Sequence, residues 1–236
     1  MVDSTNKIER TPESENRRAN FEKIAQRSPD QNVNELYDKL GGDGYDVFVK
    51  EVNFNEPAEF MKMVGAGQVV DIDPASEVLD VGAGTGICGN LLKEKGFANV
   101  TGVDPSQALL DKLAASGAYK ATRCMYLGLG LDKYPDDLKG KFDLVTAGGV
   151  FLVGHIPPVG FEDCHASLKT NGYFVTGMRT AYWSGEQEGY RAKIDEMIAA
   201  GNFKLIHTTT SIRGRKGETG IYGEQESTLI VLQRVD

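Results

Sequence analysis

The sequence has few of the residues from which disulfide frameworks and zinc sites are built. Its 236 residues include three cysteines and three histidines. Cys88, Cys124 and Cys164 are widely separated and show no paired spacing, so neither a disulfide framework nor a zinc site is indicated. We expect them to be reduced, mostly buried thiols in a cytoplasmic protein. Clustered acids are lacking too, so we predict no metal.

Long apolar runs and an excess of basic charge are also absent. No apolar stretch approaches the roughly 20 residues of a membrane span, and the N-terminus lacks the apolar core of a signal peptide. The formal charge at pH 7 is −8. Because nonspecific nucleic-acid binding depends on Lys and Arg that neutralise phosphates, this charge argues against a nucleic-acid partner. We therefore expect a small-molecule substrate and no membrane partner, while the oligomeric state stays open.

The length and the 40% hydrophobic content predict one sizeable core in a single domain. Residues 1–32 are rich in Glu, Arg, Asn and Ser, so we expect a disordered or loosely docked segment, with 20–27 as its best helical candidate. Residues 33–236 are expected to form the domain, with a lid at its N-terminal end.

The most informative stretch is an apolar run that leads into three alternating glycines. Residues 78–86 read Val-Leu-Asp-Val-Gly-Ala-Gly-Thr-Gly, which predicts a buried strand, a tight turn and a helix start. Glycine permits positive φ and has no Cβ, so this turn can approach a ligand closely, and the helix start offers unpaired N–H groups. A second predicted strand ends at Asp104, one helix and one turn later, where a carboxylate suits a ribose diol.

Strands alternate with helices along the rest of the chain. We expect strands at 78–81, 100–104, 119–127, 142–147, 173–178, 203–212 and 227–233, with a loop at 179–183. The last two strands form a hairpin. This order predicts an α/β fold, a mainly parallel sheet covered on both faces with one antiparallel strand near its edge. Ligands of such sheets bind at the carboxyl ends of the strands, where strand order reverses.

Ahead of the first strand, Tyr-Asp occurs twice across a glycine-rich gap, at Tyr37-Asp38 and Tyr45-Asp46. One interpretation is a helix end, a glycine turn and a new helix start, with the tyrosines as core aromatics. The other is a lid whose rings and hydroxyls close over a bound cofactor or substrate.

A glycine-rich first turn alone leaves several cofactors open, because dehydrogenases, flavoproteins and methyl-transfer enzymes all use one. The dinucleotide pattern needs its third glycine three residues after the second, whereas Gly86 follows Gly84 by two. Asp80 precedes the loop, and its carboxylate would repel a phosphate but attract the charged methionine part of a sulfonium cofactor. Both features favour a sulfonium cofactor over a pyrophosphate.

At this point the sequence resembles the class I S-adenosylmethionine-dependent methyltransferases. Four blocks keep the order and spacing of that family: 80–86, 103–106, 142–145 and 168–173. The resemblance implies a Rossmann-like fold of seven strands with the C-terminal strand antiparallel. It also implies S-adenosylmethionine (SAM) as cofactor, S-adenosylhomocysteine (SAH) as product, and in-line methyl transfer to the acceptor.

Within that family the chain looks most like the small methyltransferase-like proteins named after the Williams–Beuren syndrome region. They share the Tyr-Asp repeat, the Leu-Gly pair at 127–128 and the Arg-Thr pair at 179–180, although Leu40-Gly41 stands where the group has Trp-Ala. The cofactor residues that the resemblance implies are Asp80, Gly82, Gly84, Gly86, Asp104, Pro105, Ser106, Leu127, Gly128, Ala147, Tyr37 and Tyr45.

On the acceptor side the candidates are few. Methyl transfer to a hydroxyl requires an oriented acceptor and a general base. His155, after the fourth strand, is the candidate base. The alternative is that His155 is a surface or loop-packing histidine. Arg179, Tyr182 and Trp183 follow the fifth strand and could form a wall that binds a carboxylate or an aromatic group, or could be plain loop packing.

Two other classes of function stay open from the sequence. The first is a catalytically silent module that binds SAM, which the intact glycine loop and Asp104 disfavour. The second is a nicotinamide-dependent oxidoreductase, which the glycine spacing and the closing hairpin disfavour.

Overall fold

The computed structural model describes residues 11–12, 14–15, 18–19, 21–22, 33–185 and 189–236. Most of the segment 1–32, including most of the helix candidate at 20–27, lies outside these described residues. Three residues of the segment that are described, Ser14, Arg18 and Phe21, are buried. Within the described ranges, no helix combines the length and the apolar character needed to cross a bilayer.

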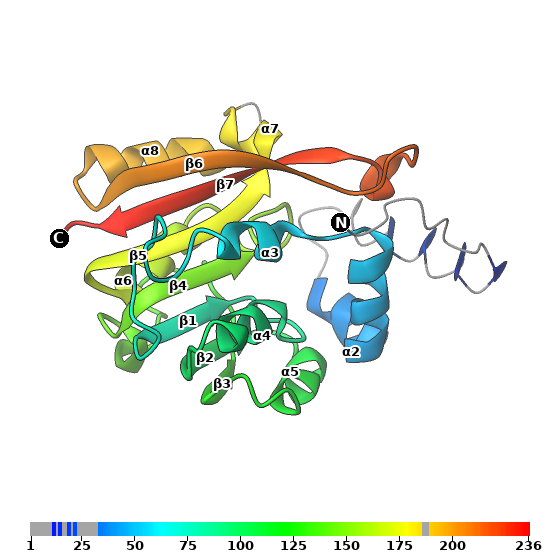
Figure 1. The fold of residues 1–236 in the computed structure, drawn as a ribbon, viewed down its shortest axis with the longest axis horizontal. Coiled ribbons are helices and arrows are strands. Elements are labelled where there is room, and N and C mark those ends of the chain that lie inside the picture. Colours follow the sequence, from blue (N-terminus) through cyan, green and yellow to red (C-terminus); the bar gives the residue numbers. More distant parts are fainter. Residues whose placement is uncertain (1–10, 13, 16–17, 20, 23–32, 186–188) are drawn as a thin grey trace.

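Seven strands form one sheet in the order β3-β2-β1-β4-β5-β7-β6 (Figure 1). They are β1 (Glu77–Val81), β2 (Asn99–Asp104), β3 (Ala121–Cys124), β4 (Phe142–Gly148), β5 (Leu168–Arg179), β6 (Phe203–Arg213) and β7 (Gln225–Arg234). β7 pairs antiparallel with β5 and with β6, whereas the remaining pairs are parallel. The predicted Rossmann-like sheet with an antiparallel C-terminal strand is therefore confirmed. Its strand order reverses between β1 and β4, where such sheets bind ligands.

Helices cover both faces of the sheet, as predicted. They are α2 (Val33–Glu51), α3 (Glu56–Met61), α4 (Ile87–Glu94), α5 (Gln107–Ala114), α6 (Gly160–Ser167), α7 (Thr180–Trp183) and α8 (Tyr190–Ala199), with 3₁₀ turns at Asp136–Leu138 and Gly220–Tyr222. On one face, Phe161 of α6 and Ile194 of α8 belong to a core with Val145 of β4. On the other face, Phe60 of α3 packs in a second core with Leu144, the strand neighbour of Val145. This alternation along β4 places the sheet between two apolar layers.

Some elements differ from their predicted bounds. β3 has four residues instead of the expected 119–127, because its pairing with β2 runs only from Ala121 to Cys124, opposite Thr101 to Asp104. β5 begins at Leu168, ahead of the predicted Tyr173, and its register with β4 shifts there, with Asn171 at φ 65°. Most of the loop expected at 179–183 is instead the short helix α7.

α2 lies beyond the carboxyl ends of the central parallel strands (Figure 1). Gly41 interrupts it with φ 68° and ψ 168°, so α2 consists of two helical pieces joined at the glycine-rich gap between the Tyr-Asp pairs. The tip of the β6–β7 hairpin meets the end of α2, where Arg215 donates to the carbonyl oxygens of Lys50 and Glu51 at 2.7 and 2.9 Å. These contacts bring the hairpin and α2 to the same end of the sheet.

Candidate functional site

The glycine turn after β1 forms the floor of the site. Gly82, Gly84 and Gly86 have φ values of 64°, 55° and 97°, a region that residues with a Cβ rarely adopt. A Cβ on Gly82 would lie 2.2 Å from Val150, whereas a Cβ on Gly84 would face Tyr45 at 3.6 Å. Gly82 therefore permits close packing of the loop after β4, and Gly84 presents bare backbone to the space under Tyr45. Gly86 is the N-cap of α4.

Asp104 ends β2 beside this turn and is held by backbone donors. Its Oδ2 accepts the Gly84 N–H at 2.9 Å, and its Oδ1 accepts the Ser106 N–H at 2.8 Å. The side chain is buried, and burial raises its pKa, against the lowering effect of these two hydrogen bonds. Each carboxylate oxygen keeps a further lone pair for hydroxyl donors from a ligand.

Asp80 lies beneath the turn rather than in the site. It is fully buried, and its oxygens accept the hydroxyls of Tyr119 at 2.6 Å and Thr146 at 2.8 Å. Tyr119 in turn accepts the Gly89 N–H of α4 at 3.0 Å. Burial raises the pKa of Asp80 to about 6. The arrangement makes Asp80 a support for the turn and for the start of α4.

One cavity lies over the turn and Asp104. Among the residues that the sequence predicts for the cofactor, Tyr37, Tyr45, Gly82, Gly84, Asp104, Pro105 and Leu127 line it. Asp80, Gly86, Ser106, Gly128 and Ala147 are not among its lining residues. Ser106 instead caps α5 by accepting the Leu109 N–H at 3.3 Å, and the Gly128 N–H is donated to Asp163 at 2.6 Å.

In each Tyr-Asp pair of α2, the tyrosine lines the cavity and the aspartate bonds to a neighbouring loop. Each tyrosine lines the cavity, and the two rings meet edge to face at 5.7 Å. Asp38 accepts the Ser106 hydroxyl at 2.6 Å, and Asp46 accepts the Thr85 hydroxyl at 2.7 Å. The aspartates therefore fasten α2 to the loops after β1 and β2, a role that the sequence analysis missed.

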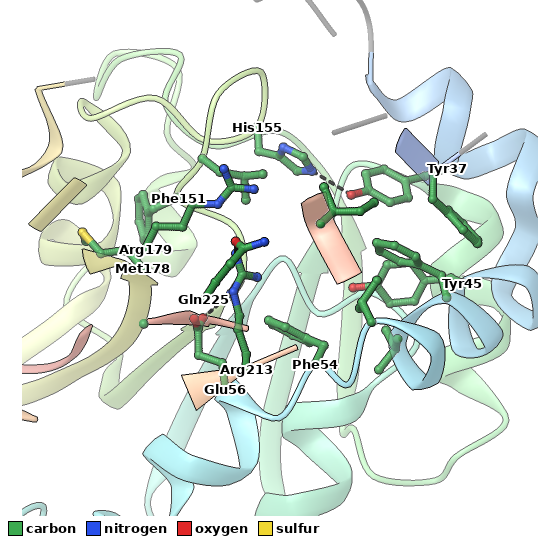
Figure 2. Close-up of a pocket in the computed structure, with 18 residues that line it drawn as sticks. Tyr37, Tyr45, Phe54, Glu56, Phe151, His155, Met178, Arg179, Arg213 and Gln225 are labelled. Carbon is green, nitrogen blue, oxygen red and sulfur yellow. Dashed lines mark hydrogen bonds between the residues drawn. The ribbon is translucent and has the colours of Figure 1, made fainter. Parts of the chain in front are cut away.

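A second cavity adjoins the first, and Figure 2 shows the side chains around it. Tyr37, Tyr45, Gly149 and His155 line both cavities, so they form the boundary between them. The remaining wall combines aromatic rings with charged groups from distant segments. Its lining includes Phe21, Phe48, Phe54, Phe151, Glu56, Met178, Arg179, Arg213 and Gln225.

The three residues predicted for an acceptor wall separate in the structure. Arg179 lines the second cavity. Tyr182 is buried in the core of one sheet face, and Trp183 contacts Arg191, whose guanidinium carbon lies 4.2 Å from the indole ring centroid. Neither Tyr182 nor Trp183 is among the lining residues of the two cavities, because α7 turns them away from the end of β5.

His155 meets α2 at the boundary of the cavities. Its Nε2 lies 2.7 Å from the Tyr37 hydroxyl, and its Nδ1 lies 3.4 Å from the Val153 carbonyl oxygen. With the proton on Nδ1 directed at that carbonyl, Nε2 accepts the hydroxyl proton of Tyr37. In this tautomer Nε2 is the basic nitrogen, on a residue that lines both cavities. Figure 2 shows the imidazole of His155 beside the Tyr37 hydroxyl.

Several lining residues were missed from the sequence. Glu56 begins α3, Arg213 ends β6, and Gln225 begins β7. No motif marks them, and only their place at the carboxyl edge of the sheet brings them together. Within the described ranges no group of three His, Cys, Asp or Glu side chains could hold a metal ion.

Known proteins resemble parts of this chain. A family profile described as "Methyltransferase domain" matches residues 79–174. Human methyltransferase-like protein 27 is 30% identical over 125 residues, which cover 52% of this chain and 49% of that protein. Ubiquinone biosynthesis O-methyltransferase from Pseudomonas aeruginosa is 29% identical over 98 residues, 41% of each chain. The chain thus spans about half the length of these curated relatives or less.

Among solved structures, the fold is similar to that of magnesium protoporphyrin IX methyltransferase from Synechocystis, determined with bound SAH. The TM-score is 0.56 at 16% identity, and the match covers 85% of this chain and 98% of that one. At this identity the likeness concerns the fold.

Proposed function

We propose that the chain is a class I S-adenosylmethionine-dependent methyltransferase, as the match to a methyltransferase domain and the likeness to methyltransferase-like protein 27 support, and that it methylates a small-molecule acceptor. The observation that carries the proposal is the pair of adjoining cavities with a common wall. The first contains the glycine turn and Asp104, and the second opens beside it without either. Two such sites place a methyl donor and an acceptor next to each other, which is the main requirement of an in-line transfer.

The residues of the first cavity fit SAM. Gly84 offers backbone without a side chain, and Asp104 offers oriented carboxylate oxygens for ribose hydroxyls. Leu127 and Pro105 supply apolar walls for the adenine ring of SAM. When bound, SAM supplies an electrophilic methyl group on a sulfonium, which an acceptor nucleophile displaces. We propose that Gly82 and Gly86 shape the turn. Four further residues do not line the cavity, and we propose that they support the residues that do: Asp80, Ser106, Gly128 and Ala147.

We propose His155 as the base for a hydroxyl acceptor. Its Nε2 lies 2.7 Å from the Tyr37 hydroxyl. In the tautomer with the proton on Nδ1, Nε2 is placed to accept the proton of a bound hydroxyl acceptor. Tyr37 would yield that place when the acceptor enters. The proton lost by the acceptor hydroxyl then resides on Nε2, and the imidazolium can return it to water after the product leaves.

α2 supports a division of the domain into a core and a lid. We propose that residues 33–236 form one domain and that α2 is its lid, because its tyrosines lie over both cavities while its aspartates hold it to the core.

Cys88, Cys124 and Cys164 are free thiols, which is consistent with the proposed cytoplasmic location.

An acceptor screen with radiolabelled SAM tests the proposal. We expect transfer to a small hydroxyl compound, and we expect His155→Ala to lower the rate by about 10²- to 10⁴-fold, the usual contribution of a general base. The variant should still bind SAH, which assigns the loss of rate to the transfer step. His207→Ala, on β6, is the matched control and should keep the parental rate.

The outcomes separate the alternatives. Label transferred only to RNA or to protein would refute the small-molecule acceptor. SAM binding without transfer to hydroxyl, amine or thiol compounds would favour the silent binding module.

A further inference from the structure

Two arginines from different strands converge in the second cavity. Arg179 is the last residue of β5, and Arg213 is the last residue of β6. Both line the cavity, and in Figure 2 both guanidinium groups point into the space between His155 and Phe54. A pair of like charges on one wall is unfavourable unless an anion lies between them.

The guanidinium donors of these arginines are largely unused. Arg213 donates from Nη2 to Gln225 Oε1 at 3.0 Å, while its Nε is buried and makes no hydrogen bond within the described part of the chain. For Arg179, no side-chain hydrogen bond or ion pair forms among the described residues; its guanidinium carbon lies 5.9 Å from the centroid of the Tyr182 ring. A buried donor without an acceptor is costly. A bound ligand with acceptor oxygens would remove that cost.

The charges around the cavity set the charge of such a ligand. Glu56 is buried against the backbone of Gly177, and its Oε1 accepts the Gly149 N–H at 3.1 Å. Burial raises the pKa of Glu56, while Arg213 and, more weakly, Arg179 favour its charged form. With Glu56 in the charged form that the arginines favour, two arginines and one glutamate leave one formal positive charge. A monoanion balances it, whereas a dianion would add repulsion with Glu56.

The rest of the wall indicates a flat apolar body. Aromatic rings line the cavity between the arginines and α2, and Phe151 stacks on Phe161 behind the wall at 4.2 Å. The lining rings are Phe21, Tyr37, Tyr45, Phe48, Phe54 and Phe151. Such surfaces favour planar ligands, which stack or pack edge to face.

We propose that the acceptor is a planar hydroxylated monocarboxylic acid, with its carboxylate bound by Arg179 and Arg213 and its hydroxyl directed toward His155. Guanidinium groups match the geometry of a carboxylate, and His155 lies where the two cavities meet. This inference rests on the proposed function, since it names the class of acceptor for the same site.

Calorimetry on the SAH-saturated protein tests the inference with matched probes. 4-Hydroxybenzoate and 4-hydroxycinnamate are compared with their amides and with 4-hydroxyphenyl phosphate. We expect at least one of the acids to bind about tenfold or more tightly than its amide, and the phosphate to bind more weakly than the acids. Arg179→Gln and Arg213→Gln should each reduce acid binding about tenfold and remove the preference over the amide.

Control variants show whether a loss of acid binding is specific to Arg179 and Arg213. Arg191→Gln, at an arginine that pairs with Asp195 on α8, should keep parental acid binding. Arg179→Lys and Arg213→Lys keep the positive charge and should retain part of the preference for the acids over their amides. If a glutamine variant fails to bind SAH, the lysine variant at the same position is measured in its place.

Three results would overturn the inference: equal binding of acids and amides by the parent protein, tighter binding of the phosphate, or a preference that survives both glutamine variants. Failure of the parent protein to bind SAH would instead count against the proposed function. Failure of the acceptor inference and failure of the proposed function are therefore distinguishable.

Discussion

At the residue scale, two aspartates at or beside the carboxyl ends of neighbouring strands have different environments. Asp104 lines the first cavity, whereas Asp80 is covered by Tyr119 and Thr146. The sequence shows the same pattern for both, an acid after an apolar run, so both could be predicted as strand ends. Their division into a cavity-lining group and a buried support could not be predicted, because it depends on Tyr119, which is distant in sequence from Asp80.

Asp80 should make the stability of the protein depend on pH. Burial raises its pKa to about 6, against about 3.9 in an unfolded chain. Between these values the folded state binds more protons than the unfolded state, so the free energy of unfolding falls as pH rises. Asp80→Asn removes this contribution. From pH 4 to pH 7, the unfolding free energy of the variant relative to the parent should therefore change by about 2 kcal/mol in the variant's favour.

Urea denaturation of both proteins across that pH range measures the difference. A difference that stays constant with pH, or one that moves in favour of the parent protein, would contradict the environment assigned to Asp80.

At the element scale, α2 shows what a motif can and cannot predict. The glycine-rich gap predicted the break at Gly41, and the aromatic rings suggested a lid. The repeat did not indicate that Asp38 and Asp46 reach Ser106 and Thr85. These bonds join segments that are far apart in the chain, and spacing along a sequence carries no signal for them.

The anchoring of α2 leads to a prediction with an internal control. Asp46 accepts the Thr85 hydroxyl and pairs with Lys112 at 2.6 Å, whereas Asp43 pairs with Lys112 from a side chain that is 99% exposed. Asp46→Ala should loosen α2 over the first cavity and weaken SAH binding by about 1 kcal/mol, the usual net worth of such a hydrogen bond. Asp43→Ala should leave SAH binding unchanged, since exposed ion pairs contribute little.

Calorimetric titration of SAH into each variant provides the measurement, and hydrogen exchange of the α2 amides reports the loosening directly. Equal affinities for the two variants would show that α2 does not need its contact with the glycine turn.

At the scale of the whole molecule, the sequence predicts the first cavity far better than the second. The first is built from a turn and a strand end that lie close together in the chain, and periodicity with glycine spacing locates both. The second collects side chains from Phe21 to Gln225, and only the complete sheet brings these together. Tyr182 and Trp183 follow Arg179 closely in the sequence, but the helix α7 places them outside the second cavity, which Arg179 lines.

Binding of SAH to the glycine turn is the claim on which the rest depends. Calorimetry with SAH and NADH, on the parent protein and on two valine variants, tests it directly. Gly84 and Gly140 both have positive φ, but a Cβ on Gly84 would face Tyr45 in the cavity, whereas one on Gly140 would meet nothing within 4 Å. The account predicts that the parent binds SAH and not NADH, that Gly84→Val abolishes SAH binding, and that Gly140→Val retains it. Binding of NADH instead of SAH by the parent, or unchanged SAH affinity in Gly84→Val, would contradict the account.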